Sequence, residues 1–411
     1  MKALASATKT TRLDELGFVS RGRSRHRPRN DASLYGGEYP FFQTGDIKAA
    51  NLYLTEYTQT YSEAGLAQSK MWEKGTLCIT IAANIAETAI LGVPGCFPDS
   101  VVGFVPDPDK ADVRFIKYYI DILKLGMQSI SRGTTQDNMS VEKLMSFDFN
   151  VPDLPTQRKI AGILSAYDDL IENNLRRIKI LEQMAQSLYR EWFVHFRFPG
   201  HESAKFKDSE LGRIPDGWEV KKLGELADQM RRCVSKGQLD EVTRYVGLEH
   251  IPRQSLALDD WEEVSELGSN KLLFKRGEVL FGKIRPYFHK VVCAPFDGVC
   301  SADTIIIRAK KPDHRALVTF CVFTEAFVAH ATATSNGSKM PRTDWKVLKD
   351  YPLVLPPNDL LARFSKLSEK AIDQQQNLVK RNQTLRHTRD LLLPQLLACN
   401  QQAKRQIANS I

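Results

Sequence analysis

Cysteine is scarce in this sequence, and the cysteines do not follow a spacing typical of disulfide frameworks or metal sites. The seven cysteines of the 411-residue chain are odd in number and scattered, and no two of them form a CxxC pattern. This excludes a disulfide framework and gives no zinc site. No apolar run approaches the roughly 18 residues that a membrane-spanning helix needs, and residues 1–11 lack the apolar region of a signal peptide. We therefore expect a soluble protein of the reducing cytoplasm.

The sequence also lacks the motifs of the common enzyme classes. It contains no GxxxxGK[ST] phosphate-binding loop, no HExxH zinc motif, no GxSxG nucleophile motif and no glycine-rich dinucleotide-binding turn. The eight histidines are isolated from one another. The adjacent carboxylates Asp168 and Asp169 stand in a helical pattern, where we interpret them as solvated charges rather than as an acid–base pair. The chain is therefore predicted to have no catalytic residues and no metal site.

The longest uninterrupted pattern runs from Thr156 to Phe193. It contains no proline and no glycine after Gly162, and its apolar residues recur at alternating steps of three and four, which is typical of a coiled-coil seam. A helix of this length spans about 55 Å at 1.5 Å per residue, so it is predicted to act as a spacer. The predicted seam residues are Leu164, Tyr167, Ile171, Asn174, Ile178, Leu181 and Leu188. Asn174, the polar interruption, is either a register device or a tolerated exposed residue.

A shift of 204 residues places one half of the chain on the other. Gly133 then falls on Gly337, and the alternating run at 147–151 falls on 351–355. The match extends over some sixty residues and into the helix, so the chain is predicted to be a tandem duplication of a globular region followed by a long helix.

Each half alternates short strand patterns with helical patterns, which predicts a mixed α/β (α+β) fold. The predicted strands are 39–47, 75–82, 101–105 and 147–151 in the first half and 245–251, 277–281, 301–307 and 351–355 in the second, with helices at 112–130 and 317–330. In chain order the predicted parts are a first globular domain (1–152), a long helix (153–197), a polar linker (198–217), a second globular domain (218–355), a second long helix (356–397) and a polar tail (398–411).

The second helix is predicted to run from Asn358 until Pro394 breaks it. One row along it is apolar and includes Leu378, Leu385 and Leu392. The other row consists of Ser368, Gln375, Asn382 and Arg389, which is too polar for a strong homodimer. We therefore expect this helix to pair with the richer stripe of the first helix as an antiparallel coiled coil.

Positive charge points to a polyanionic partner. The net charge is +8, and the segment 21–29 carries five arginines separated by small residues, His and Pro. Such a run belongs at the surface, where alternating arginines on an extended segment can meet successive phosphates. A solvated basic loop without a partner is the alternative.

Several long segments resemble one family, the DNA-specificity subunits of Type I restriction-modification systems. They are YPFFQTGDI at 39–47, VPDLPTQRKIAGILSAYDDLIENN at 151–174, GRIPDGWEVKKLGEL at 212–226, YVGLEHI at 245–251 and LRHTRDLLLPQLL at 385–397. The resemblance covers nearly the whole chain and includes its duplicated layout. The opening of the second helix departs from the family, where an acidic and glutamine-rich start is usual.

The resemblance implies a role and partners. The two globular parts would be target-recognition domains, each recognising one half of a bipartite DNA sequence, and the coiled coil would set their separation. Two modification subunits would methylate adenine at N6, and restriction subunits would translocate and cleave DNA. S-adenosylmethionine, ATP and Mg²⁺ would be bound by these partners and not by this chain.

Equivalent polar loops of the two halves are the predicted DNA contacts, because basic and amide side chains serve both phosphates and base edges. The candidates are Arg21, Arg23, Arg25, Arg132, Gln136 and Asn138 in the first half and Lys283, Arg285, Asn336, Lys339 and Arg342 in the second. Phe281, Tyr287 and Phe288 are predicted to be core residues rather than base-stacking ones. Two alternatives stay open: a self-sufficient DNA methyltransferase or nuclease with divergent motifs, and a coiled-coil adaptor that does not bind DNA.

Overall fold

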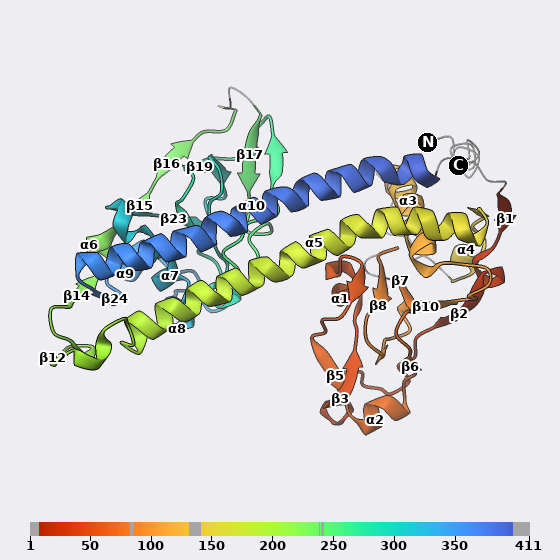
Figure 1. Ribbon diagram of the computed structural model, residues 1–411, viewed down its shortest axis with the longest axis horizontal. Helices are drawn as coiled ribbons and strands as arrows, with labels where there is room; N and C mark the ends of the chain where they lie inside the picture. The colour runs from red at the N-terminus through yellow and green to blue at the C-terminus, as the bar shows by residue number, and fades with distance from the viewer. Residues whose placement is uncertain (1–7, 83–85, 131–140, 238, 240–241, 398–411) are drawn as a thin grey trace. The chain divides into compact units, whose positions relative to one another are not determined.

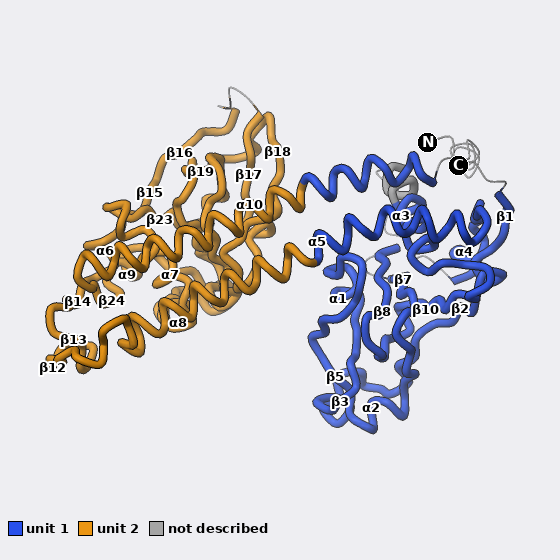
Figure 2. The backbone as a smooth tube through the Cα atoms, in the orientation of Figure 1, with its two compact units in different colours: residues 1–172, 384–411 blue, residues 173–383 orange. Residues whose placement is uncertain are grey.

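The computed structural model describes residues 8–82, 86–130, 141–237, 239 and 242–397, and for 125–130 it describes the backbone only. They form two compact units (Figures 1 and 2), of which unit 1 comprises residues 1–172 and 384–411 and unit 2 comprises residues 173–383. Each unit has a globular part and a stretch of each of two long helices, α5 (Leu154–Tyr189) and α10 (Asn358–Leu397).

The globular part of unit 1 contains two main β-sheets, with strand orders β2-β10-β7-β8-β4 and β5-β3-β9-β6, and a strand pair β1-β11. Its strands are β1 Lys9–Thr11, β2 Gly17–Arg21, β3 Tyr35–Phe41, β4 Tyr53–Leu54, β5 Gln59–Tyr61, β6 Met71–Trp72, β7 Leu77–Thr80, β8 Thr88–Leu91, β9 Gly95–Cys96, β10 Val101–Pro106 and β11 Phe149–Val151. Its helices are α1 Thr44–Ala49, α2 Glu63–Ala67, α3 Val113–Ile130 and α4 Val141–Met145. Phe115, Tyr118 and Tyr119 of α3 share a core with β7 and β10.

Unit 2 repeats this topology. Its two main sheets have the orders β15-β23-β20-β21 and β16-β19-β22-β17-β18, and β14 pairs with β24. Its strands are β12 Phe206–Ser209, β13 Gly212–Pro215, β14 Glu219–Lys222, β15 Ala227–Met230, β16 Arg232–Val234, β17 Thr243–Val246, β18 Glu262–Val264, β19 Lys271–Phe274, β20 Val279–Gly282, β21 Val291–Cys293, β22 Gly298–Cys300, β23 Thr304–Ala309 and β24 Pro352–Leu355. Its short helices are α6 Leu223–Leu226, α7 Arg315–Val322, α8 Glu325–Ala333 and α9 Trp345–Leu348.

The strand pairing follows the duplication to within one residue. In unit 1 the parallel pair β3 and β9 joins Phe41 to Cys96, and positions 41 and 96 shifted by 204 are 245 and 300. Both shifted positions lie in the parallel pair of β17 and β22, which joins Tyr245 to Val299 and Val246 to Cys300. Apart from β4 in unit 1 and β16 in unit 2, the main sheets of the two halves therefore share strand order and strand direction as well as sequence pattern.

Strand β20 is apolar throughout because both of its faces are covered. In β20, Val279 and Phe281 belong to the core under α7, whereas Leu280 between them belongs to a second core on the opposite face. Side chains alternate between the faces of a strand, so a strand between two cores is apolar at every position.

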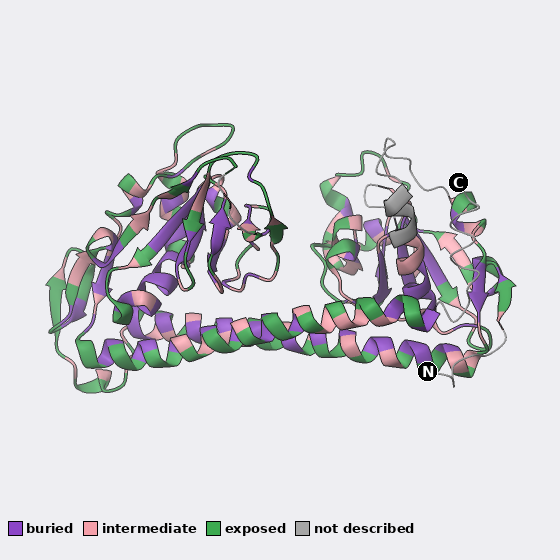
Figure 3. Cartoon of the chain, turned by 90° about the horizontal axis from the view of Figure 1, so that it is seen from above, coloured by how far each residue is buried: buried purple, intermediate pink, exposed green. Residues whose placement is uncertain are grey.

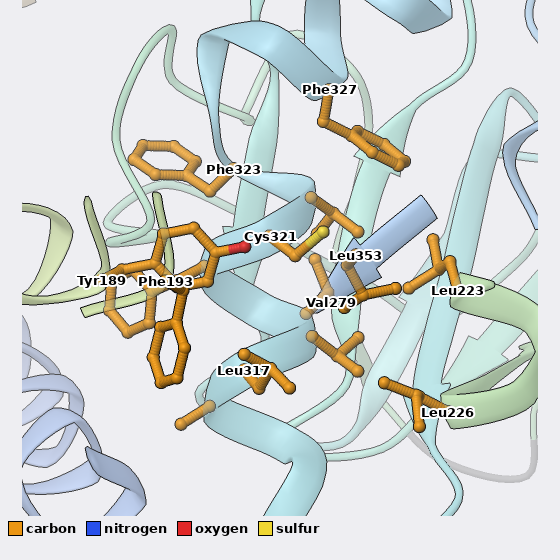
Figure 4. Packing of buried hydrophobic residues seen from close by; sticks show 14 of the residues in the cluster. Tyr189, Phe193, Leu223, Leu226, Val279, Leu317, Cys321, Phe323, Phe327 and Leu353 are labelled. Carbon is orange, nitrogen blue, oxygen red and sulfur yellow. The ribbon is translucent and has the colours of Figure 1, made fainter. Parts of the chain in front are cut away.

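The predicted helix at 317–330 is two helices in the structure. α7 ends at Val322, and α8 starts after Thr324, whose hydroxyl accepts a hydrogen bond from Phe327 N at 3.1 Å. Such an N-cap favours a new helix over continuation of the old one. Among the described residues no single helix is long and apolar enough to cross a membrane. The helix pair α7 and α8, which is bent by 67°, has the length and composition of a membrane span, but by these two criteria alone. The apolar residues of α7 and α8 fill the core of unit 2, where Leu317 and Cys321 lie beside Tyr189 and Phe193 (Figure 4).

The segment predicted as a polar linker contains ordered structure. β12 and β13 form an antiparallel hairpin, and Ile214 in it is 1% exposed. Ile214 and Trp218 pack into the same core as Phe193, which fixes the chain where it leaves α5. The polar composition of 198–217 concealed these apolar anchors.

Within unit 2 the long helices pair antiparallel. Asn174 of α5 donates to Asn382 of α10 at 2.8 Å, Ile178 packs with Leu378, and the rings of Tyr189 and Phe364 lie 6.1 Å apart. Residue numbers thus rise along one helix as they fall along the other. Asn174 is 8% exposed, so of the two interpretations the buried register device agrees with the structure.

The polar row of α10 is buried. Ser368, Gln375 and Asn382 are each at most 3% exposed. Buried residues recur along α5 and α10 (Figure 3), and Leu164 and Ile171 of the predicted seam are fully buried, whereas Tyr167, Leu181, Leu188, Leu385 and Leu392 are half-buried. The seam is therefore a mixed apolar and polar interface.

Two sequence-based interpretations of the helices were wrong. Asp168 is not solvated: it is 1% exposed, accepts a hydrogen bond from the Tyr118 hydroxyl and forms an ion pair with Arg389. Pro394 does not end α10, which continues to Leu397. A proline removes one backbone hydrogen bond, and the burial of Leu393 and Leu396 in the core of unit 1 offsets this cost.

Candidate nucleic-acid interface

In unit 2 the structure joins the two loops that carry the predicted DNA contacts. Lys283 and Arg285 follow β20 directly, and Asn336, Lys339 and Arg342 lie between α8 and α9. Thr343 N donates to Lys283 O at 3.0 Å, and Arg285 N donates to Pro341 O at 2.7 Å. These bonds join the segment that follows β20 to the second loop, so residues about 60 positions apart form one surface.

The second loop is closed on itself. Asn336 and Arg342 exchange two backbone hydrogen bonds, of 2.9 and 2.8 Å. Gly337 lies inside this closed loop and has a φ of +94°, a backbone conformation that residues other than glycine rarely adopt. Lys339 is exposed between the two closing residues, at the tip of the loop.

The charges of this surface are only partly compensated. Arg342 lies 3.6 Å from the Asp303 carboxylate and is half exposed, which leaves donors of its guanidinium free to point outward. Arg285 adopts a left-handed backbone with φ 48°, and its guanidinium lies 5.9 Å from the Phe288 ring. Among the described residues, no carboxylate pairs with the ammonium of Lys283 or of Lys339.

Tyr287 is not a core residue as predicted: its side chain is 51% exposed beside Phe288, the two ring centroids being 4.8 Å apart. A short 3-10 helix at Pro286–Phe288 turns this ring away from the core. Phe281 is fully buried and Phe288 is half-buried.

In unit 1 the arginine segment is extended and anchored. Burial alternates along it: Arg21, Arg23 and Arg25 are exposed, whereas Gly22 and Ser24 are buried. The alternation follows from strand geometry, which sends successive side chains to opposite faces. Three predicted phosphate contacts thus lie on one face of the segment.

The anchor of this segment is the turn at 68–69. Arg23 Nε donates to Ser69 O at 2.9 Å, Ser69 Oγ donates to Arg23 O at 2.8 Å, and Gln68 Oε1 accepts from Arg25 N at 2.6 Å. The neighbouring Lys70 ammonium lies 3.7 Å from the centroid of the Trp72 ring. Burial, and to a lesser degree the charge of Arg23, lowers the pKa of Lys70. The remaining candidates, Arg132, Gln136 and Asn138, lie outside the described residues.

One concave site was missed from the sequence. It lies in unit 2 next to the joined loops and includes Gln229, Arg231, Lys283, Thr343 and Trp345 in its lining. We name it the unit 2 pocket. Gln229 and Arg231 belong to the run DQMRR at 228–232, whose two adjacent arginines were the available signal. The strand order β15-β23-β20 brings this run beside Lys283.

Among the described residues, no group of three or more His, Cys, Asp or Glu side chains is placed to hold a metal ion. The polar surfaces described above are built of hydrogen-bond donors, which suits an anionic or acceptor-rich ligand.

Comparisons with known proteins find one kind of relative. Residues 6–183 match the family model described as Type I restriction modification DNA specificity domain. The chain is 22% identical over 404 residues to the Type I restriction enzyme MjaIX specificity subunit of Methanocaldococcus jannaschii, covering 94% of this chain and 91% of the relative. It is 24% identical over 375 residues to the EcoDI specificity subunit of Escherichia coli, covering 85% and 78%.

A solved structure shares the fold. The crystal structure of the S subunit of a Type I restriction-modification system from M. genitalium matches with a TM-score of 0.56 and 14% identity, covering 95% of this chain and 96% of that one. The mixed α/β fold predicted from the sequence is thereby confirmed. Residues 6–183 thus match a Type I restriction modification DNA specificity domain, and over most of its length the chain is similar to Type I restriction enzyme specificity subunits.

Proposed function

We propose that the chain recognises a DNA sequence of two separated parts, one through each unit, and directs adenine N6 methylation and restriction by partner subunits. The observation that carries this proposal is the duplicated topology. Two units of the same strand order and direction, each with an outward-facing basic segment, provide two similar recognition surfaces in one chain.

The long helices supply the connection in this proposal. α5 is one continuous helix that starts in unit 1 and ends in unit 2, and α10 returns along the same two units. Helix length then limits the number of unspecified bases between the two recognised parts, since one turn of DNA spans about 34 Å.

The chemistry is assigned to partners. Two modification subunits would bind S-adenosylmethionine and transfer its methyl group, and restriction subunits would use ATP and Mg²⁺ for translocation and cleavage. The names of the relatives support this division, because each is the specificity subunit of a larger restriction enzyme.

The test is methylation mapping combined with salt-dependent DNA binding by the purified chain, alone and with its modification subunit. We expect methylated adenines within one split sequence only when the partner is present, together with an affinity that falls steeply with salt. Methylation by the chain alone would identify it as an enzyme. An absence of DNA binding under both conditions would leave a coiled-coil adaptor.

A further inference from the structure

The unit 2 pocket has the composition of a binding site rather than of a packing defect. Its lining joins β15, β16, β19, β23 and the start of α9, elements that Figure 1 labels. Thr343 in this lining is 1% exposed, and its hydroxyl has no hydrogen-bond partner among the described residues. A buried hydroxyl without a partner is costly, so a ligand that accepts its hydrogen bond would remove the penalty.

The rim of the pocket is a row of donors. Arg231 Nε donates to Gln229 Oε1 at 3.0 Å. This bond occupies the acceptor of the Gln229 amide and leaves its NH₂ group and the terminal nitrogens of Arg231 for a ligand. Lys283 adds an ammonium from the neighbouring loop. The ligand must therefore present acceptors.

Two chemical groups of DNA present several acceptors: a phosphate, and the major-groove edge of guanine with its N7 and O6. The lining discriminates between them. It includes the Asp344 carboxylate, which would repel a phosphate, and the apolar side chains of Leu272, Ile305 and Trp345, which would strip water from an anion. A neutral, flat base edge meets neither penalty.

We propose that Gln229 and Arg231, at the rim of the unit 2 pocket, contact the major-groove edge of a guanine in the DNA segment that unit 2 recognises; this inference rests on the proposed function. Arg231 provides the pair of donors that matches N7 and O6, and Gln229 holds the guanidinium plane in place. Lys283 and the joined loops contact the flanking backbone, which carries no sequence information.

The assay is methylation mapping in cells that express the complete modification complex with Arg231→Ala or Gln229→Ala. We expect each variant to methylate sites in which one guanine of one half of the split sequence has been replaced, with discrimination at that base pair reduced about tenfold or more. The other half should stay unchanged. Arg213→Ala is the matched control, because Arg213 is an exposed arginine on the β12–β13 hairpin that does not line the pocket.

Thr343→Val provides a second test, which distinguishes a contact with DNA from a purely structural role of the hydroxyl. Valine has nearly the shape of threonine without the hydroxyl, so loss of an unpartnered buried hydroxyl should leave the melting temperature unchanged or raise it. We expect the affinity of the complex for its target DNA to fall several-fold at the same time.

The remaining outcomes overturn the inference. An unchanged methylated sequence with unchanged affinity in all three pocket variants would show that the pocket does not contact DNA. An unchanged sequence with uniformly weaker binding and a smaller salt slope would show a phosphate contact instead. If the wild-type complex methylates no split sequence, the proposed function fails and this inference fails with it.

Discussion

The same two helices enclose a charged cluster in unit 1 and an amide pair in unit 2. In unit 1, Asp168 of α5 is held by Arg389 of α10 and by the Tyr118 hydroxyl from the globular part. In unit 2, Asn174 and Asn382 contact each other across the helices at 2.8 Å. The duplication therefore preserved the fold but not the polar groups at its helical seam.

The difference concerns what each contact joins. The cluster in unit 1 links three elements, α3, α5 and α10, so it attaches the helix pair to the globular part of the unit. Burial raises the pKa of the Tyr118 hydroxyl, and the Asp168 carboxylate raises it further, which keeps the phenol protonated as a donor. The amide pair in unit 2 joins only the two helices.

In unit 2 the buried carboxylate that contacts the globular part is Glu182 of α5. This carboxylate is 5% exposed and accepts a hydrogen bond from Leu256 N in the loop that follows β17. Burial raises the pKa of Glu182 to about 7, and none of the groups that shift this pKa carries a positive charge. The buried carboxylate of unit 1 thus has a cationic partner, whereas the buried carboxylate of unit 2 is a group whose pKa burial raises to about 7.

The largest effect is expected from Arg389→Met. The substitution leaves the fully buried Asp168 carboxylate without its counter-charge, which costs on the order of 3–5 kcal/mol. Amide hydrogen exchange of peptides from 154–172 would measure this as a lower opening free energy for the helix in unit 1. Peptides from 173–189 should change much less, because they belong to the other unit.

Arg381→Met is the matched control for Arg389, because Arg381 is an exposed arginine on the same helix. It should change the opening free energy by less than about 0.5 kcal/mol. Combining Arg389→Met with Asp168→Leu and Tyr118→Phe should restore most of the loss, since an apolar replacement of a buried charge cluster is often neutral. A loss below about 1 kcal/mol for Arg389→Met alone would show that the ion pair does not hold unit 1 together.

The second effect is a pH dependence confined to unit 2. Because the folded pKa of Glu182 lies above its unfolded value, its contribution to stability is fully present below about pH 4.5 and is lost as the pH rises through about 7. Glu182→Gln removes this titration. Relative to the parent, it should therefore gain on the order of 3 kcal/mol between about pH 4.5 and pH 8.

Denaturation of parent and variant at matched pH values measures this difference. Glu202→Gln serves as control, because Glu202 is a carboxylate of unit 2 whose side chain is 77% exposed. Parallel pH profiles for the parent and Glu182→Gln would contradict the raised pKa and remove the contrast between the units.

The comparison shows which features of the fold were readable from the sequence. The long helices were predictable because steps of three and four are a local signal that survives in every window. The duplication was predictable because a constant shift preserves the turns and strands together. The fate of Asp168 was not predictable, because its partner Tyr118 lies 50 positions away on α3 and only the packed fold brings it to the helix.

The candidate interface also contains features that were predictable from the sequence and features that were not. The loops at 283–285 and 336–342 could be selected by charge, glycine and repeat position, yet the backbone hydrogen bonds that join them through Thr343 and Pro341 form only in the folded chain. Gln229 and Arg231 stand in and after a strand with no motif. They join the interface only because β15 lies next to β23, two strands from β20.

The smallest effect is expected at Asn174. Asn174→Leu removes the donor that Asn382 accepts and should destabilise the helix pair of unit 2 by about 1 kcal/mol, whereas Leu at both positions should regain or exceed the parental stability. The double variant should nevertheless populate a second register, because it lacks the buried amide pair, which penalises a shifted seam. Spin labels at the exposed positions 177 and 381, with the exposed Cys233 replaced by serine, would report this as a single distance in the parent and two populations in the double variant. A single distance in both the parent and the double variant would show that the apolar contacts of Ile178 and Leu378 set the register. The amide pair would then differ from the charged cluster of unit 1 in strength alone.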